Sequence, residues 1–359
     1  MSHYNLPLLR LVERDGYVGP VIMELLRRRA YARAGLVGNP SDGYFGKTIS
    51  LSLKNFWAEV VLYEWDEVEI VLSQDDRSRF QSVNELAQDV RLHGYYGGVR
   101  LVKATIKRFV EFCQCNNLPL HDRNFAVRYQ SNIPRQVGLA GSSAIIVATL
   151  RALMDFYRVE IPKQVQPSLV LSVESGELGI AAGLQDRVIQ IYGGLVYMDF
   201  AKDRMTEQMG FSCGVYEPLD PTLLPPIYVA YSADVSEPTE AVHNPLRARF
   251  QAGEPAVITA MQTFAGLAAE ARGAILQRDV ARLSALMDEN FNTRRRICQL
   301  AAKHVEMIEV ARRAGASAKF AGSGGAIVGI YTDDEMFARL KTDLGAIGCQ
   351  VIQPILDLA

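Results

Sequence analysis

The segment Pro134–Ala144, with the sequence PRQVGLAGSSA, offers the clearest chemistry in this chain. It lies between an alternating, strand-like stretch (125–130) and an apolar pattern typical of a helix. Its glycines would let several backbone N–H groups turn toward one point, where the start of the helix adds a partial positive charge. Such a loop suits a triphosphate, and the hydroxyl of Ser142 or Ser143 could ligate Mg²⁺, which prefers oxygen ligands. The simpler alternative is a flexible loop that ends in an ordinary helix cap.

Two further segments share this glycine-rich, polar character. Arg33–Tyr44 has the sequence RAGLVGNPSDGY, which predicts a short strand followed by a turn. Lys319–Gly325 has the sequence KFAGSGG and precedes an apolar run typical of a strand. Each of them alone is compatible with a simple turn, so neither identifies a function by itself.

In this order, the three segments resemble the three sequence motifs of the GHMP kinases, the family of galactokinase, homoserine kinase, mevalonate kinase and phosphomevalonate kinase. The resemblance spans most of the chain. It implies an α+β fold of two domains, the N-terminal one like ribosomal protein S5 domain 2 and the C-terminal one ferredoxin-like, with ATP in the cleft between them. A loop rich in proline and polar residues, Asp199–Pro226, predicts the boundary, which we place between 1–210 and 211–359.

The resemblance also implies the nucleotide site. The residues expected to contact ATP lie in the two glycine loops: Pro134, Gly138, Leu139, Ala140, Gly141, Ser142, Ser143, Ala144, Gly322, Ser323 and Gly324. Mg²⁺ is the expected metal, held by Ser143 and Glu174, with Ser142 and Glu177 as the competing choices. The alternative for Glu174 taken alone is a solvated helix carboxylate.

Asp186 is the expected catalytic residue, because family members place their catalytic aspartate similarly, just before a Tyr-Gly-Gly sequence. It would orient and deprotonate the hydroxyl that receives the phosphate. Arg33 is its expected cationic companion, since an arginine nearby would hold the carboxylate ionised and offset charge on the transferred group.

Five stretches resemble one branch of the family in particular: Gly38–Asp42 with Tyr44–Gly46, Gly94–Arg100, Asn132–Gln136, Gly183–Arg187 and Arg294–Arg296. They are most similar to those of kinases that phosphorylate glucuronate at the anomeric hydroxyl. Asp42 and Tyr44 are the expected contacts to the sugar. The carboxylate of a sugar acid needs a cation, and bidentate arginine suits it best, so Arg187 is expected to bind it, with Arg135 as the second choice. Other candidates lie near the motifs, namely Arg100, Lys47 and one or two of Arg294–Arg296. A kinase for galactose, fucose, a heptose or mevalonate is the alternative, as is a non-catalytic sensor of ATP and sugar.

The surrounding pattern predicts the elements that must position these residues. Helices are predicted at Val18–Arg29, Leu101–Cys115, about Ser143–Tyr157, Pro167–Glu174, Leu184–Ile191, Pro255–Leu276, Val280–Arg296 and Val305–Ala314. Strands are predicted at Ile49–Leu53, Trp57–Tyr63, Phe125–Gln130 and Ile227–Ser232, and after the glycine loop within Phe320–Tyr331. Strands and helices alternate without regular βαβ spacing, which favours an α+β fold over a doubly wound sheet.

Bulk properties restrict the function class. The formal net charge of −2 gives no indication of a general nucleic-acid or membrane-surface binder, which would be basic. No apolar run approaches the roughly 18 residues of a membrane span. The five cysteines are scattered and odd in number, which indicates free thiols in a reducing cytoplasm rather than disulfides or zinc ligands. We therefore expect a cytoplasmic enzyme, a monomer or a homodimer, whose partners are a small sugar acid and ATP.

Overall fold

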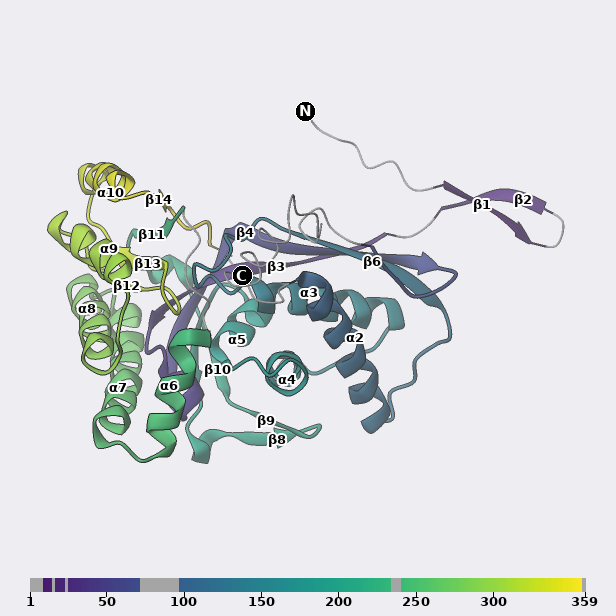
Figure 1. Cartoon of the computed structure of the whole chain (residues 1–359), viewed down its shortest axis with the longest axis horizontal. Coiled ribbons are helices and arrows are strands. Elements are labelled where there is room, and N and C mark those ends of the chain that lie inside the picture. Colours follow the sequence, from purple (N-terminus) through teal and green to yellow (C-terminus); the bar gives the residue numbers. More distant parts are fainter. Residues whose placement is uncertain (1–8, 15–16, 23–24, 72–96, 234–239, 357–359) are drawn as a thin grey trace, which may run out of the picture.

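The computed structural model of the protein describes residues 9–14, 17–22, 25–71, 97–233 and 240–356 (Figure 1). Two sheets, each with helices packed on it, make up most of this part, and an N-terminal hairpin of β1 (Leu9–Arg14) and β2 (Tyr17–Ile22) extends away from them. The α+β class predicted from the sequence is confirmed.

The larger sheet has six strands in the order β10-β7-β4-β6-β5, with β3 also paired to β4. They are β3 (Leu26–Val37), β4 (Lys47–Trp65), β5 (Glu69–Val71), β6 (Asn124–Ser131), β7 (Leu195–Asp199) and β10 (Val215–Leu219). Strand β4 is the central strand of this sheet. One of its edges pairs with β3, and the other pairs first with β7 and then with β6.

Helices cover one face of this sheet (Figure 1). They are α2 (Gly98–Cys115), α3 (Gly141–Tyr157), α4 (Gln166–Ser172), a short π-helix η3 (Val173–Glu177) and α5 (Gln185–Tyr192). Helix α3 is apolar on nearly every side and is buried between the sheet and α2. Because α3 and α5 both contact β3 and β4, the loops that begin these two helices reach the same region as the end of β3.

The smaller sheet has four antiparallel strands in the order β12-β13-β11-β14. They are β11 (Ile227–Ser232), β12 (Lys319–Phe320), β13 (Ala326–Ile330) and β14 (Cys349–Ile352). Numbered along the chain, this order is 4-1-3-2 from β14, which is the ferredoxin-like arrangement that the sequence predicts. Helices α9 (Ala302–Arg313) and α10 (Asp334–Ala346) pack together beside it.

A helical pair joins the two sheets. Helix α7 (Pro255–Gln277) and helix α8 (Val280–Ile297) are connected by two residues, of which Asp279 caps α8 by accepting a hydrogen bond from the N–H of Arg282. Helix α7 contacts β3 and β4 of the larger sheet, while α8 contacts β12 and β13 of the smaller one. Helix α6 (Glu240–Gln251) packs against α7.

Three expectations from the sequence are wrong. The helix predicted at Val18–Arg29 is strand β2 and the start of β3, because its apolar spacing also fits a strand and Gly19–Pro20 disfavours a helix. The two strands predicted between 49 and 63 are one continuous strand, β4, with a bulge opposite Tyr31 and Ala32.

The third wrong expectation is the loop Asp199–Pro226, which contains three short strands: β8 (Thr206–Gln208), β9 (Phe211–Cys213) and β10. The division at 210 and 211 stays a prediction. Because β10 belongs to the larger sheet, the strand pairing favours a boundary a few residues later, after Leu219.

Candidate active site

The loop before α3 has the backbone of an anion-binding nest. It leads from β6 into α3, and three of its residues have left-handed backbone angles: Gln136 with φ of 57°, Gly138 with 74° and Ala140 with 63°. Alternation of such residues with ordinary ones turns successive N–H groups toward one side, and the first N–H groups of α3 add to them. We call this segment, Pro134–Ala140, the phosphate loop.

A second glycine loop, Gly322–Gly325 between β12 and β13, lies directly against the phosphate loop. A Cβ atom on Gly322 would collide with the carbonyl oxygen of Gly138. In the other direction, a Cβ atom on Gly138 would stand 2.8 Å from the carbonyl oxygen of Gly324. The two backbones therefore approach as closely as only glycine allows, and the segments predicted from the sequence to act together form one surface.

Arg294 of α8 fixes the second glycine loop through hydrogen bonds to its backbone. Its side chain is buried and donates hydrogen bonds to the carbonyl oxygens of Gly322 (2.7 Å) and Ser323 (3.0 Å). Its guanidinium also lies over the ring of Phe320, 5.4 Å from the centroid. Burial lowers the pKa of Arg294. Arg295 and Arg296 are exposed and pair with Glu309 and Glu289, so only one of the three arginines reaches the loops.

Lys319 is a second buried cation beneath the loops. Its ammonium group donates to the carbonyl oxygens of Gly35 (2.6 Å) and Phe320 (2.7 Å) and to Oδ1 of Asn39 (2.6 Å). These three acceptors use all three N–H donors of a protonated lysine. Burial lowers the pKa of Lys319 well below its usual range, and the positive charge of Arg294 lowers it too. Lys319 thus fastens the end of β3 to the second glycine loop.

Arg33 and Asp186 form the charged pair that the sequence predicts. Nε of Arg33 donates to Oδ1 of Asp186 at 2.6 Å, and Nη2 donates to Oδ2 at 2.8 Å. Nη1 of the same arginine donates to the carbonyl oxygens of Gly138 (2.5 Å) and Ala321 (3.3 Å). Arg33 is buried, whereas the Asp186 side chain keeps 19% of its surface exposed. A reacting hydroxyl can therefore reach the carboxylate, while the arginine fixes its orientation.

Asp42 stands beside Asp186, in the short 3₁₀-helix η1 (Ser41–Tyr44). Its Oδ2 accepts a hydrogen bond of 3.1 Å from the backbone N–H of Gln185. Burial raises the pKa of Asp42 to about 6, and the negative charge of Asp186 contributes to that rise. A Cβ atom on Gly183 would collide with the same carboxylate, so glycine is required there. Two carboxylates from different elements thus lie close enough for their charges to interact.

Tyr44, two residues after Asp42, packs against helix α6. Its ring packs on the ring of Phe250, with centroids 4.8 Å apart. Burial, together with the negative charge of Asp42, raises the pKa of the Tyr44 hydroxyl to about 12. The hydroxyl therefore keeps its proton near neutral pH and can donate a hydrogen bond.

Arg187 lies beside Asp186, but its guanidinium is engaged within the protein. It is buried, and its Nε (2.7 Å) and Nη2 donate to Oε2 of Glu174, while Nη1 donates to the carbonyl oxygen of Gly183 (2.9 Å). Its donors are already used inside the protein, which disfavours binding of the substrate carboxylate by this residue; that role stays a prediction. The sequence predicts separate roles for Glu174 and Arg187. In the structure, η3 carries Glu174 and α5 carries Arg187, and the two side chains form one buried ion pair.

Glu174 is nevertheless close to the proposed catalytic group. Burial raises the pKa of Glu174, and the nearby charge of Asp186 also raises it. Arg187 lies between them, with Nη1 3.4 Å from Oδ2 of Asp186. The competing carboxylate, Glu177, instead pairs with Lys107 of α2 at 2.8 Å and does not take part in this network.

The two candidate serines occupy the first turn of α3. Ser143 is buried, and its hydroxyl donates to the carbonyl oxygen of Ala140 at 3.2 Å, whereas Ser142 is partly exposed. The same carbonyl accepts a hydrogen bond from Nε2 of Gln190 (2.8 Å), a residue of α5 that sequence reasoning missed. In the described part of the chain, no three histidine, cysteine, aspartate or glutamate residues are grouped to hold a metal.

The remaining candidates differ in their surroundings. Arg135 is exposed on the phosphate loop, and Lys47 pairs with Asp199 at 3.0 Å. Arg100 stands in the first turn of α2. The segment Gly94–Arg100, which contributes to the family resemblance, lies in part outside the described residues.

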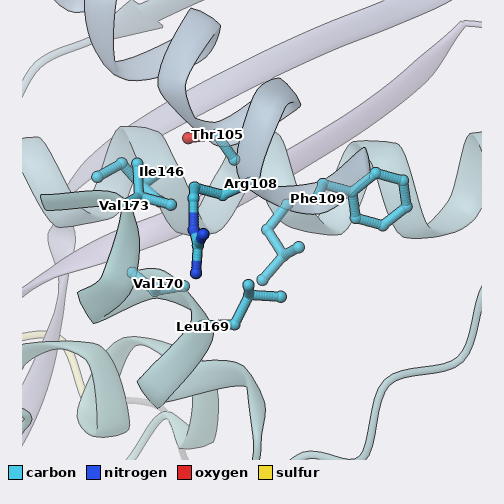
Figure 2. Close-up of a pocket in the computed structure, with 8 residues that line it drawn as sticks. Thr105, Arg108, Phe109, Ile146, Leu169, Val170 and Val173 are labelled. Atoms are coloured by element: carbon cyan, nitrogen blue, oxygen red, sulfur yellow. The ribbon is translucent and has the colours of Figure 1, made fainter. Parts of the chain in front are cut away.

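A small pocket between α2, α3 and α4 is separate from this site (Figure 2). Its lining is mostly aliphatic and aromatic, with two polar side chains, Thr105 and Arg108. Arg108 donates hydrogen bonds to Ser172 and Glu111, and Thr105 donates one to the carbonyl oxygen of Leu101. None of the site residues discussed above lines it. Across the described ranges, no helix combines the length and apolar character needed to cross a membrane.

Comparison with known proteins places the chain among kinases. Residues 100–194 match the model of the GHMP kinases N terminal domain. The chain is 47% identical over 310 residues to Glucuronokinase 1 of Arabidopsis thaliana, covering 84% of each protein. It is 46% identical over 312 residues to Probable glucuronokinase 2 of the same plant, covering 85% of this chain and 84% of the relative.

Solved structures support the fold. The galactokinase of Lactococcus lactis, solved with galactose, superposes with a TM-score of 0.72 at 14% identity, covering 93% of this chain and 94% of that one. The mevalonate kinase of Methanococcus jannaschii superposes with a TM-score of 0.67 at 18% identity, covering 92% and 99%. At such low identity these similarities concern the fold alone.

Proposed function

The chain belongs to the GHMP kinase family, and we propose that it transfers the γ-phosphate of ATP to the anomeric hydroxyl of D-glucuronate, giving glucuronate 1-phosphate and ADP. It is an ATP-dependent kinase that phosphorylates a hydroxyl group. The choice of glucuronate is supported by the high identity to two plant glucuronokinases over most of the chain. The single observation that carries the site is the bidentate pair of Arg33 and Asp186 beside the two glycine loops.

The proposed reaction begins with the sugar hydroxyl at Asp186. The carboxylate accepts the hydroxyl proton as the oxygen attacks the γ-phosphorus, and the bond from that phosphorus to the bridging oxygen of ADP breaks. Arg33 orients the carboxylate through two hydrogen bonds and places positive charge near the phosphate loop. In a loose transition state, this positioning and charge neutralisation account for most of the catalysis.

The nucleotide site is proposed to include the phosphate loop and the second glycine loop. Backbone N–H groups of the first, with the N-terminus of α3, would bind the phosphates. Arg294 contributes positive charge from below, and in the described part of the chain it is not paired with a carboxylate. This unneutralised charge favours a polyanionic ligand. Lys319, whose pKa is lowered well below its usual range, holds the loop through its hydrogen bonds.

Mg²⁺ is proposed to bind with the nucleotide, near Glu174 and the serine hydroxyls of α3. The donor set fits a hard cation that keeps most of its ligands as water and phosphate, because Arg187 engages Oε2 of Glu174 and leaves Oε1 for a ligand. When bound, the metal neutralises charge on the β- and γ-phosphates. The choice between Ser142 and Ser143, a cytoplasmic location, and a monomeric or dimeric state stay predictions.

A substrate panel tests the function. Purified protein is assayed by coupled ADP detection with ATP, Mg²⁺ and each of D-glucuronate, D-galacturonate, D-glucose, D-galactose, L-fucose and mevalonate. We expect the highest kcat/KM for glucuronate, and a phosphorus NMR doublet from coupling to the anomeric proton should identify the product as the 1-phosphate. A wide preference for galactose or mevalonate would refute the glucuronate assignment and leave the kinase assignment intact.

A further inference from the structure

A sugar acid brings a carboxylate into the site, and burying it without a cation would be costly. The cations nearest Asp186 are already engaged. Arg33 pairs with Asp186, and Arg187 pairs with Glu174. Lys47 pairs with Asp199. These three cations are therefore not free to accept the substrate carboxylate, which leaves room for a cation from another element.

Helix α6 lies beside the segment that carries Asp42. Phe250 of this helix packs on Tyr44, only two residues from Asp42. Arg247 precedes Phe250 by three positions, and residues three apart on a helix lie on the same face. The positive charge of Arg247 accordingly acts on the Tyr44 hydroxyl, where it opposes the rise in pKa that burial causes.

Arg247 also has the surroundings of a ligand-binding residue. Its side chain is exposed, and among the described residues no hydrogen bond or ion pair engages its guanidinium. The neighbouring Arg249 differs, because its guanidinium is tied to both Glu254 (2.7 Å) and the carbonyl oxygen of Ile297 (2.5 Å). Arg249 thus fixes helix α6 in place, whereas the guanidinium of Arg247 is available to a ligand near Tyr44.

We propose that Arg247 binds the carboxylate of the sugar acid and sets the preference for a uronate over a neutral sugar. This inference rests on the proposed function and names the residue that carries its specificity. The fork of a guanidinium matches a carboxylate in two parallel hydrogen bonds. Tyr44, which packs against α6, is placed to bind a neighbouring oxygen of the sugar.

Steady-state kinetics with two matched substrates tests the proposal. D-glucuronate and D-glucuronamide differ only by the replacement of the carboxylate with a neutral amide. For Arg247→Met we expect kcat/KM for glucuronate to fall by roughly 10- to 100-fold, the worth of a hydrogen-bonded charge. The value for glucuronamide should change by less than about threefold, because the amide cannot use the charge. Arg247→Lys should recover part of the loss.

Arg295→Met is the matched control, since Arg295 is an exposed arginine of α8 paired only with Glu309 among the described residues. It should leave both substrates unchanged, and thermal unfolding should show that all variants fold. An equal loss with both substrates, or none with either, would overturn the role of Arg247 while wild-type activity on glucuronate upholds the proposed function. A wild-type enzyme that phosphorylates neither compound would refute both.

Discussion

At the scale of single residues, Arg33 determines the layout of the site. Its guanidinium contacts the Asp186 carboxylate and two backbone carbonyls, one in each of the glycine segments. An arginine can do this because its five N–H donors lie in a rigid plane, whereas a lysine has a single nitrogen. The proposed base, the phosphate loop and the second glycine loop therefore keep a fixed geometry relative to one side chain.

Replacement of Asp186 tests the proposed base. Asp186→Asn keeps the shape of the side chain and removes its charge, so kcat should fall by roughly 10²–10⁴-fold. The loss should lie near the lower end, because a loose transition state needs little help from a base. Single-turnover measurements with saturating ATP would give the rate of the chemical step. An unchanged rate would assign the role to another carboxylate, of which Asp42 is the nearest candidate.

Asp42 gives the site a dependence on pH. Its pKa is raised from 3.8 to about 6, chiefly by burial and then by the charge of Asp186, while the N–H of Gln185 and the guanidinium groups of Arg187 and Arg33 oppose the rise. The folded protein thus holds the proton more tightly than the unfolded chain. The contribution of Asp42 to the free energy of unfolding is present below pH 3.8 and is lost as the pH rises through about 6.

Sugar binding should follow the opposite trend. Above pH 6 the Asp42 carboxylate can accept a hydrogen bond from a sugar hydroxyl, and below it the protonated group cannot do so as well. The KM for the sugar, measured from about pH 5 to 8, should therefore rise as the pH falls through about 6. Asp42→Asn should remove this rise, and its persistence in the variant would assign it to the nucleotide or to another group.

At the scale of elements, the contact of the two glycine loops is the critical feature. Gly138 and Gly322 come from loops in different sheets and meet backbone to backbone. Elements of each sheet hold one loop: β6 and α3 hold the first, while β12, β13 and Arg294 of α8 hold the second. A nucleotide bound to one loop is therefore within reach of the other.

A methyl group at Gly322 should disturb this contact. In Gly322→Ala the new Cβ would collide with the carbonyl of Gly138, so the loops must separate, and kcat/KM for ATP should fall by about 10- to 100-fold. Gly345→Ala is the control. Gly345 lies in helix α10, where an added Cβ would meet no described atom within 4 Å, so alanine should leave activity unchanged and stabilise the helix by up to about 1 kcal/mol. Equal kinetics in both variants would show that the loop contact is dispensable.

The elements also show where sequence reasoning works. The helices α2, α3, α7 and α8 follow from apolar residues three and four positions apart, and the structure confirms them within a few residues. Local patterns cannot decide pairing, so they predict a helix where β2 and the start of β3 lie, and two strands where β4 runs unbroken. Motif spacing brings Arg33 and Asp186 together correctly because both belong to recognisable segments.

At the scale of the whole molecule, the features that the sequence does not reveal depend on contacts between distant segments. Arg187 is next to Asp186 in the sequence, yet its buried partner is Glu174 in another helix. Arg247 lies outside every motif, and only the packing of α6 on Tyr44 brings it to the site. The sequence carries no signal for the Arg187–Glu174 pair or for the position of Arg247. Both depend on how the two sheets and their helices pack together.

The assembly of the site also has a consequence for synthesis on the ribosome. Arg33 and its partner Ala321 are 288 positions apart, and Lys319 joins Gly35 to a segment made equally late. At translation rates of about 5–20 residues per second, about 15 to 60 s pass between the appearance of the arginine and that of its last carbonyl partner. The phosphate loop and then Asp186 are made partway through this interval. Until residues 319–321 are made, the nascent chain lacks the contacts that complete the site, so we expect no phosphoryl transfer before then.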